Sequence, residues 1–296
     1  MLALIMRSRW HSAVAVLVFC SSLFVFPPLF IVSSGILALV CLTHGLKESL
    51  IVAAIASIIW WGVCLLVQVN PSLAILFAIW LPTILLAYQV KMKGDMNIIF
   101  IATIIMAIAL WLLIVSQTGV DSTAFWQKML VDEFIPLLEQ LQMEPEVISF
   151  FQTNQSQIAT NLNSAVISAF MLVIWISLFI GRAWQAKLYN PKGFANDFKS
   201  LSMGKGLSII GLAVVGLPFI QPFLLISDLQ NTFMLLFLLQ GLSVAHFFIT
   251  VKKLPIFVAT LMYICIIIFP FVGTFILVIG AVDNWYNIRA KFALVE

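Results

Sequence analysis

Eight long apolar segments, none containing a formally charged residue, constrain this chain more than any other feature of its sequence. An ion at the centre of a bilayer costs about 2.5–3.5 kcal/mol on insertion scales, so charge-free runs of about 20 residues are typical of membrane-spanning helices. The sequence therefore predicts an all-α, polytopic transmembrane helical bundle, formed as a single integral membrane domain over residues 1–296. The segments are 12–43, 50–69, 71–90, 97–116, 161–181, 206–226, 231–250 and 254–282.

Overall composition excludes a soluble fold. The chain is 63% hydrophobic and 9% charged, whereas soluble domains are about 45–50% apolar and about 25% charged. Surface-to-volume scaling does not let a chain of this size hide so much apolar surface from water. Lipid must therefore serve as its solvent, and the bilayer is its first partner.

The first and last apolar segments are longer than the rest, and each has proline near its middle. These are Pro27–Pro28 in one segment and Pro270 in the other. Proline removes a backbone donor and kinks or breaks a helix. Each segment is therefore either one long kinked helix or a pair of short ones, which gives 8–10 crossings.

The positions of Lys and Arg favour ten crossings with both termini in the cytoplasm, because cytoplasmic loops carry the excess of these residues. In this arrangement 14 of the 15 Lys and Arg face the cytoplasm, and only Lys128 lies outside. If both long segments cross once, the best orientation places only 10 inside. We expect a multi-pass protein of the bacterial inner (plasma) membrane.

Residues 117–160 form an external loop with six acids and one lysine. Pro136 should bend an amphipathic helix in this loop, and Pro145 should begin a second helix that runs into the next span. The apolar residues of the first helix recur at helical spacing and should pack on the bundle. They are Trp126, Leu130, Phe134, Leu137 and Leu141.

Residues 182–205 form a cytoplasmic basic loop that mixes cations with aromatic side chains. Such mixtures suit lipid headgroups, and they also suit a partner subunit that docks in the cytoplasm or membrane. Asn190–Pro191–Lys192–Gly193 has the composition of a turn. The contact candidates in this loop are Arg182, Trp184, Lys187, Tyr189, Asn190 and Phe194.

A second stretch of this kind closes the chain at 280–292. Trp285 and Arg289 are four residues apart and are expected to share one helical face, where they can stack. Asp283 is expected to cap that helix at its N-terminus. Trp285 and Arg289 are therefore further candidates for contact with headgroups or a partner.

Gln221, Gln240 and His246 are predicted to lie within spans and are the candidates for binding a small neutral or zwitterionic solute. The alternative is that they join helices through interhelical hydrogen bonds. The apolar segments contain no Asp, Glu, Lys or Arg. This absence disfavours a proton-coupled transporter and a voltage sensor, which need charged groups inside the membrane.

No pattern of catalytic or metal-binding residues emerges. The chain has no HExxH, no phosphate-loop motif and no paired carboxylates near a face, and its four cysteines lack the spacing of a metal site. The basic loop is explained by topology and does not indicate nucleic-acid binding. We expect no enzyme activity, no catalytic residues, no cofactor, no metal and no nucleic-acid partner.

The stretches RAWQAKLYNPKGFANDFKSL at 182–201 and GAVDNWYNIR at 280–289 resemble the YybS-like bacterial membrane proteins, a family defined as a domain of unknown function. The hydrophobic layout agrees along essentially the whole chain. The family is regarded as distantly related to the substrate-binding (S) components of energy-coupling-factor vitamin transporters. The resemblance implies a bundle that captures a small molecule, an external loop acting as its lid, and a cytoplasmic face that meets partner subunits.

Two hypotheses about function follow. One is a transport-type, small-solute-binding membrane subunit that resembles an S component. The other is a non-transporting envelope scaffold or assembly protein, which acts through partner contacts of its loops.

Overall fold

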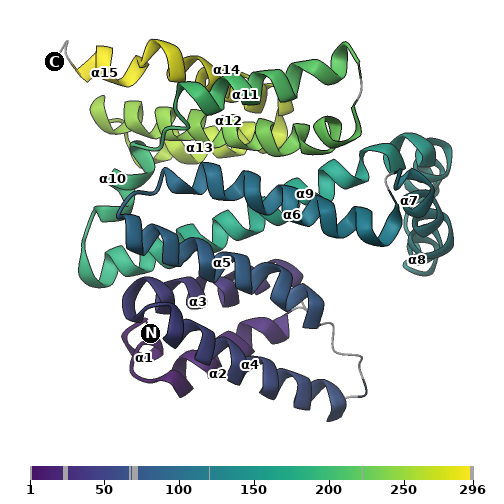
Figure 1. The fold of residues 1–296 in the computed structure, drawn as a ribbon, viewed down its shortest axis with the longest axis horizontal. Helices are drawn as coiled ribbons and strands as arrows, with labels where there is room; N and C mark the ends of the chain where they lie inside the picture. Colours follow the sequence, from purple (N-terminus) through teal and green to yellow (C-terminus); the bar gives the residue numbers. More distant parts are fainter. Residues whose placement is uncertain are drawn as a thin grey trace.

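The computed structural model describes residues 2–22, 26–66, 68, 73–119, 121–221 and 223–293, and the side chains of 73–76 and 293 are not described. Within these ranges the secondary structure is helical and no strand occurs. The all-α bundle is confirmed, and Figure 1 shows its helices stacked side by side.

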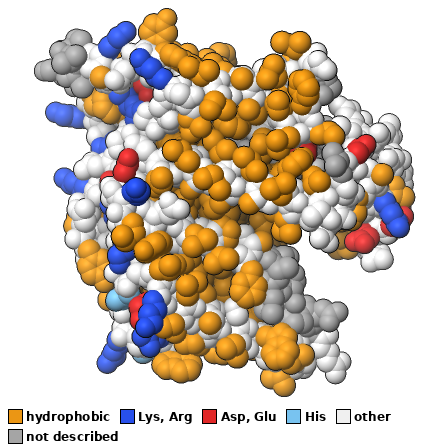
Figure 2. Space-filling view, viewed as in Figure 1, with side chains coloured by type: hydrophobic (Ala, Val, Ile, Leu, Met, Phe, Trp, Pro, Cys, Tyr) orange, Lys and Arg blue, Asp and Glu red, His pale blue; other side chains and the backbone are white. Residues whose placement is uncertain are grey.

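The apolar helices run back and forth between two ends of the molecule. Lys and Arg gather at one of these ends, which we call the basic end (Figure 2). A helical hairpin projects from the opposite end, which we call the hairpin end (Figure 1). Hydrophobic side chains cover the face between the two ends, as expected for contact with lipid (Figure 2). The helices are α2 Arg9–Ser21, α3 Phe30–His44, α4 Leu46–Leu66, α5 Leu73–Lys93, α6 Ile98–Thr118, α9 Pro145–Tyr189, α11 Lys205–Gly216, α12 Leu224–Val251, α13 Ile256–Ile268 and α14 Pro270–Tyr286.

Both long terminal segments are divided at their prolines, as predicted. A 3₁₀ turn at Pro27–Leu29 separates α2 from α3, and residues 23–25 beside it lie outside the described residues. Pro270 is the first residue of α14, which is bent by 116° from α13. Among the described residues, five helices are long and apolar enough to span a bilayer, and the bent pair makes a sixth if it is one span.

Two helix crossings depend on glycine. At the crossing of α3 and α9, a Cβ on Gly181 would lie 2.7 Å from the Cβ of Ala38 and 2.8 Å from the carbonyl oxygen of Gly35. At the crossing of α12 and α14, a Cβ on Gly280 would collide with the carbonyl oxygen of Phe237. Small residues let membrane helices approach closely, so that dispersion contacts and polar contacts hold them together.

The segment predicted at 206–226 is not a single span. Its helix α11 ends at Gly216, and a 3₁₀ turn at Leu217–Phe219 follows, because Pro218 cannot continue the helix. Gln221 is therefore exposed in the connection, and its expected position within a span is wrong. Since α12 already begins at Leu224, Asp228 lies inside an apolar helix. The expectation that no Asp, Glu, Lys or Arg enters the spans is also wrong.

The hairpin contains the predicted amphipathic helix with a shifted face. This amphipathic helix consists of α7 Thr123–Met129, a π-helical turn at Leu130–Phe134, and α8 Ile135–Gln140, and we use the word hairpin for these residues. Trp126 and Leu130 are buried as predicted. A π turn adds one residue before the chain regains the same face. Ile135 and Leu138 are therefore buried, whereas the expected positions Phe134, Leu137 and Leu141 are 37%, 48% and 62% exposed.

Helix α9 confirms two predictions. It begins at Pro145, whose missing N–H costs nothing in the first turn, and it continues without interruption through the predicted span to Tyr189. It thus carries the hairpin at one end and the start of the basic loop at the other. Trp126, Leu130 and Ala159 form a small core where the hairpin packs on α9.

Candidate functional site

The basic loop 182–205 is folded rather than extended. Asn190 ends α9, Lys192 adopts the left-handed conformation with φ 73°, and α10 Gly193–Lys199 follows. The predicted turn is thereby confirmed. Arg182 donates to the carboxylate of Asp197 from Nε at 3.0 Å and from Nη2 at 2.6 Å. This pair fixes α10 against the end of α9.

The contact candidates of this loop fall into two groups. Phe194 packs on Phe179, with ring centroids 5.8 Å apart, and Trp184 is partly buried against the core. Together with the paired Arg182, these side chains hold the loop to the bundle. Lys187, Tyr189 and Asn190 are exposed at the tip of α9 and remain available for contact.

A polar cluster joins α12, α14 and the connection between α10 and α11. Gln240 is fully buried, accepts from the backbone N–H of Met203 at 2.9 Å, and donates to Asp283 at 3.2 Å. Arg289 donates to the same oxygen of Asp283 from Nε at 3.1 Å and from Nη2 at 2.7 Å. Gln240 therefore forms the interhelical hydrogen bonds of the alternative considered from the sequence.

Arg289 lies on α15 Ile288–Ala293, and its remaining donors bind the end of α10, the connection that follows it, and α12. They reach the carbonyl oxygens of Lys199 and Leu201 at 2.7 and 2.9 Å, and the hydroxyl of Ser243 at 3.2 Å. All five N–H groups of the guanidinium are thus engaged. Arg289 fixes the end of the chain to the basic loop and is not a free headgroup contact.

The predicted geometry of the C-terminal stretch is wrong in two respects. Helix α14 ends at Tyr286, and Asn287 has a left-handed conformation with φ 44°. Trp285 and Arg289 consequently lie on different helices and do not share a face. Asp283 is in the last turn of α14, so it does not cap a helix N-terminus and instead pairs with Arg289.

The three predicted ligand candidates do not form one site. His246 lies beside Phe198, with ring centroids 5.4 Å apart, and its Nε2 is 2.9 Å from the hydroxyl of Tyr263. It is near the basic end of α12, and Gln240 lies six residues earlier, in the half of the helix toward the same end. Gln221 precedes the opposite end of this helix, so it cannot act together with the other two.

The structure instead brings a carboxylate and three partners together at the hairpin end. Asp228 accepts on Oδ2 from the indole N–H of Trp111 at 2.8 Å and from the amide of Asn163 at 3.1 Å. The amide oxygen of Asn163 accepts from the indole N–H of Trp126 at 2.6 Å. We call Trp111, Trp126, Asn163 and Asp228 the hairpin-end network.

Each member of the hairpin-end network comes from a different helix: α6, α7, α9 and α12. Asp228 is 7% exposed and Asn163 is 3% exposed. No Lys, Arg or His pairs with Asp228 among the residues that the structure describes. A buried carboxylate is therefore held by neutral donors alone.

The sequence did contain a signal for Asp228. Only residues 227–230 separate the apolar segments 206–226 and 231–250. Four residues amount to about one helical turn, which is short for a connection between two spans. Treating this gap as part of a helix would have placed Asp228 inside it.

Comparison with known proteins agrees with this architecture. The family model described as "Predicted membrane protein (DUF2232)" matches residues 13–284. The chain belongs to the DUF2232 family. The match confirms the expected membership in a membrane-protein family of unknown function. No curated protein and no solved structure matches the chain.

The DUF2232 match includes every helix of the hairpin-end network. It ends at Asn284, so Trp285 and Arg289 lie beyond it. Among the residues that the structure describes, no group of three or more His, Cys, Asp or Glu could hold a metal ion.

Proposed function

We propose that this DUF2232 protein is a non-enzymatic, transport-type membrane subunit that binds a small solute at the hairpin-end network. The observation that carries the proposal is Asp228, a carboxylate inside an apolar helix with no cationic partner among the described residues. Ionisable groups in membrane helices are costly and are typical of functional sites.

The chemistry of Asp228 favours a solute that donates hydrogen bonds. Its Oδ2 accepts both protein N–H groups, whereas Oδ1 makes no hydrogen bond to any described residue. An ammonium or hydroxyl group of the solute would donate a hydrogen bond to Oδ1, and an ammonium would also neutralise the charge of the carboxylate. A small zwitterionic or polyhydroxylated solute fits this requirement.

The hairpin supplies a lid for such a site. Trp126 lies on α7 and binds Asn163, which in turn binds Asp228. A small core of Trp126, Leu130 and Ala159 attaches the hairpin to α9, apart from the main core. Small separate cores open at lower free energy than the main core of a domain, so the hairpin is suited to admit and release a solute.

The proposal includes an orientation. The basic end would face the cytoplasm of a bacterial cell, both termini included, and the hairpin would be external, as the positive-inside rule favours. The exposed tip of α9, with Lys187 and Tyr189, would then meet a partner subunit.

Thermal unfolding of the purified protein in detergent tests the proposal. We expect a panel of small amines, amino acids and hydroxylated vitamins to contain at least one compound that raises Tm. Asp228→Asn should abolish that rise, because the neutral amide cannot pair with an ammonium. Asp132→Asn, on the exposed face of the hairpin, is the matched control and should retain it. An unchanged response in Asp228→Asn would refute the proposal.

A second function, an envelope scaffold, is favoured by one observation. Tyr189 is 62% exposed at the basic end, where an aromatic side chain can anchor a partner. Under this hypothesis Tyr189→Ala abolishes cross-linking to a neighbouring protein in cells, and Asp228→Asn has no effect on growth or binding. The opposite pattern would reject the scaffold and favour the solute-binding subunit.

A further inference from the structure

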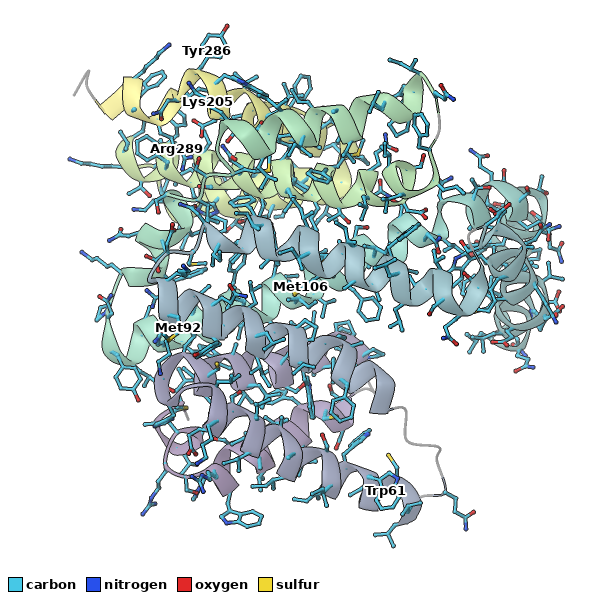
Figure 3. The ribbon with its side chains drawn as sticks, in the orientation of Figure 1. Trp61, Met92, Met106, Lys205, Tyr286 and Arg289 are labelled. Carbon is cyan, nitrogen blue, oxygen red and sulfur yellow. The ribbon has the colours of Figure 1, made fainter. Side chains whose placement is uncertain are left out.

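A cleft at the basic end, far along α12 from Asp228, is the second polar feature of the molecule. It has a volume of about 730 Å³ and lies between the connection from α10 to α11 and the ends of α14 and α15. Lys205 and Arg289, which both line the cleft, are labelled at this end in Figure 3. The cleft is lined by side chains that include Lys199, Lys205, Asp283, Asn284, Trp285 and Arg289.

Two buried oxygen atoms of the lining residues lack hydrogen-bond donors. Oδ1 of Asp283 and Oδ1 of Asn284 have no partner among the described residues, although these residues are only 4% and 7% exposed. The other polar atoms of both side chains are engaged. Oδ2 of Asp283 accepts from Gln240 and Arg289, and the amide nitrogen of Asn284 donates to the carbonyl oxygen of Gly280 at 3.1 Å.

These two acceptors identify what a ligand must offer. A buried acceptor without a partner is unfavourable, and a hydroxyl or ammonium group that donates to it removes this cost. Both oxygens are themselves covered, so a donor reaches them only after neighbouring side chains change rotamer. A ligand with two donors would satisfy Asp283 and Asn284 together, since both residues line the cleft.

The charge of the cleft identifies the other part of the ligand. Asp283 and Arg289 neutralise each other, so Lys199 and Lys205 leave the cleft positively charged. Helix α11 begins here, and its N-cap Gly204 supplies no side-chain acceptor for the N–H groups of the first turn. Lysines beside an uncapped helix N-terminus form an environment that favours phosphate.

We propose that this cleft binds a phosphate ester that carries at least two hydroxyl or ammonium donors, as in a phosphoglycerol group. The phosphate lies at Lys199, Lys205 and the start of α11, and the donors bind Asp283 and Asn284. Arg289 is a positioning residue, because all of its donors hold the cleft wall together. Exposed Trp285 beside the cleft places it at the level of lipid headgroups.

This chemistry has two sources, a soluble polyol phosphate and the headgroup of a phospholipid. The test measures binding to the full chain with glycerol 3-phosphate and inorganic phosphate in detergent, and with nanodiscs of phosphatidylglycerol or phosphatidylcholine. We expect glycerol 3-phosphate or phosphatidylglycerol to bind at least about tenfold more tightly than its counterpart without the glycerol hydroxyls, the effect of about one satisfied buried acceptor. Whichever of the two binds identifies the source.

Variants of the cleft separate binding from stability. Asn284→Leu removes one unpartnered acceptor, so it should weaken binding of the hydroxylated probe at least about tenfold without lowering the Tm of the empty protein. Lys205→Gln should weaken binding of every phosphate probe. Lys187→Gln, which removes an exposed charge at the same end but outside the cleft, is the control and should bind normally.

Three results would overturn the proposal: equal binding of inorganic phosphate and glycerol 3-phosphate together with no preference between the two nanodiscs, undiminished binding in Asn284→Leu, or an equal loss in Lys187→Gln. Failure of the solute test at Asp228 would leave these outcomes unaffected, because the two sites lie at opposite ends of α12.

Discussion

Single atoms decide how closely the helices of this protein approach. The carbonyl oxygens of Phe237 and Ile276 occupy the places that Cβ atoms would take on Gly280 and Gly241. In lipid there is little hydrophobic force between helices, so such contacts contribute much of the packing energy. Glycine at these two positions is a steric requirement of the crossing of α12 and α14.

Gly280→Ala tests this requirement. We expect the variant to lose about 1–3 kcal/mol of stability, the usual cost of overpacking, and to unfold at a lower temperature. Gly62→Ala on α4 is the matched control, since nothing lies within 4 Å of the place where its Cβ would be. Thermal unfolding in the same detergent compares the two. A Gly280→Ala protein as stable as Gly62→Ala would contradict the argument.

Individual residues also explain which structural features could be predicted from the sequence and which could not. Pro145 and Asn190–Lys192 were recognised because proline and left-handed turn positions leave a strong local signature. Gln221 was misplaced because the end of α11 and the start of α12 are both apolar, so a hydropathy pattern cannot separate them. Arg289 was misplaced because α14 ends before it at the left-handed Asn287, which puts Arg289 on the separate helix α15.

At the scale of elements, the hairpin shows a similar limit to prediction from sequence. A period of 3.6 residues predicts one continuous face from Trp126 to Leu141, and the face is correct until the π turn begins at Leu130. That turn precedes Pro136, which cannot donate a backbone hydrogen bond. Because a π turn shifts the face without changing composition, periodicity alone could not predict the burial of Ile135 and Leu138.

The start of the hairpin should depend on pH. Asp121 accepts the backbone N–H of Thr123 at 3.0 Å, and this bond, with help from the Thr123 hydroxyl, lowers the pKa of Asp121 below its ordinary value of 3.8. A lowered pKa means that the carboxylate stabilises the turn above pH 3.8 and that this stabilisation is lost as the pH falls below that value.

Hydrogen exchange can measure this dependence at the amide of Thr123. Its protection factor should fall as the pH drops below about 3.8. In Asp121→Asn the protection factor should be lower at neutral pH and should stay constant across the same range. A wild-type protection factor that does not change with pH would show that the bond does not stabilise the start of α7.

At the scale of the whole molecule, basic and acidic residues lie at opposite ends. The basic end carries the connections rich in Lys and Arg, while the six acids of 117–160 lie in and beside the hairpin (Figure 2). The sequence predicted this separation well, because charge position reports topology directly. It did not predict the hairpin-end network, whose four members lie on four helices and meet only after folding.

Cysteine labelling tests the orientation that this separation favours. In a variant lacking the native cysteines, Asp132→Cys should react with a membrane-impermeant maleimide in intact cells. Lys187→Cys should react only after the membrane is permeabilised. Both positions are exposed in the structure, so access to the thiol depends on the side of the membrane. Labelling of Lys187→Cys alone in intact cells would show that the orientation is the opposite of the one proposed.

Helix α9 gives these two ends a mechanical relationship. Its 45 residues contain no proline after the first turn, so it is about 68 Å long and behaves as a stiff rod. Near its first end Phe151 packs on Phe134 of the hairpin, with ring centroids 5.1 Å apart, and near the other Arg182 holds α10. Tilting such a rod by about 10° about its middle would displace each tip by about 6 Å. Movement of the hairpin would thus reach the basic loop as the swing of a lever, with no relay of side chains between them.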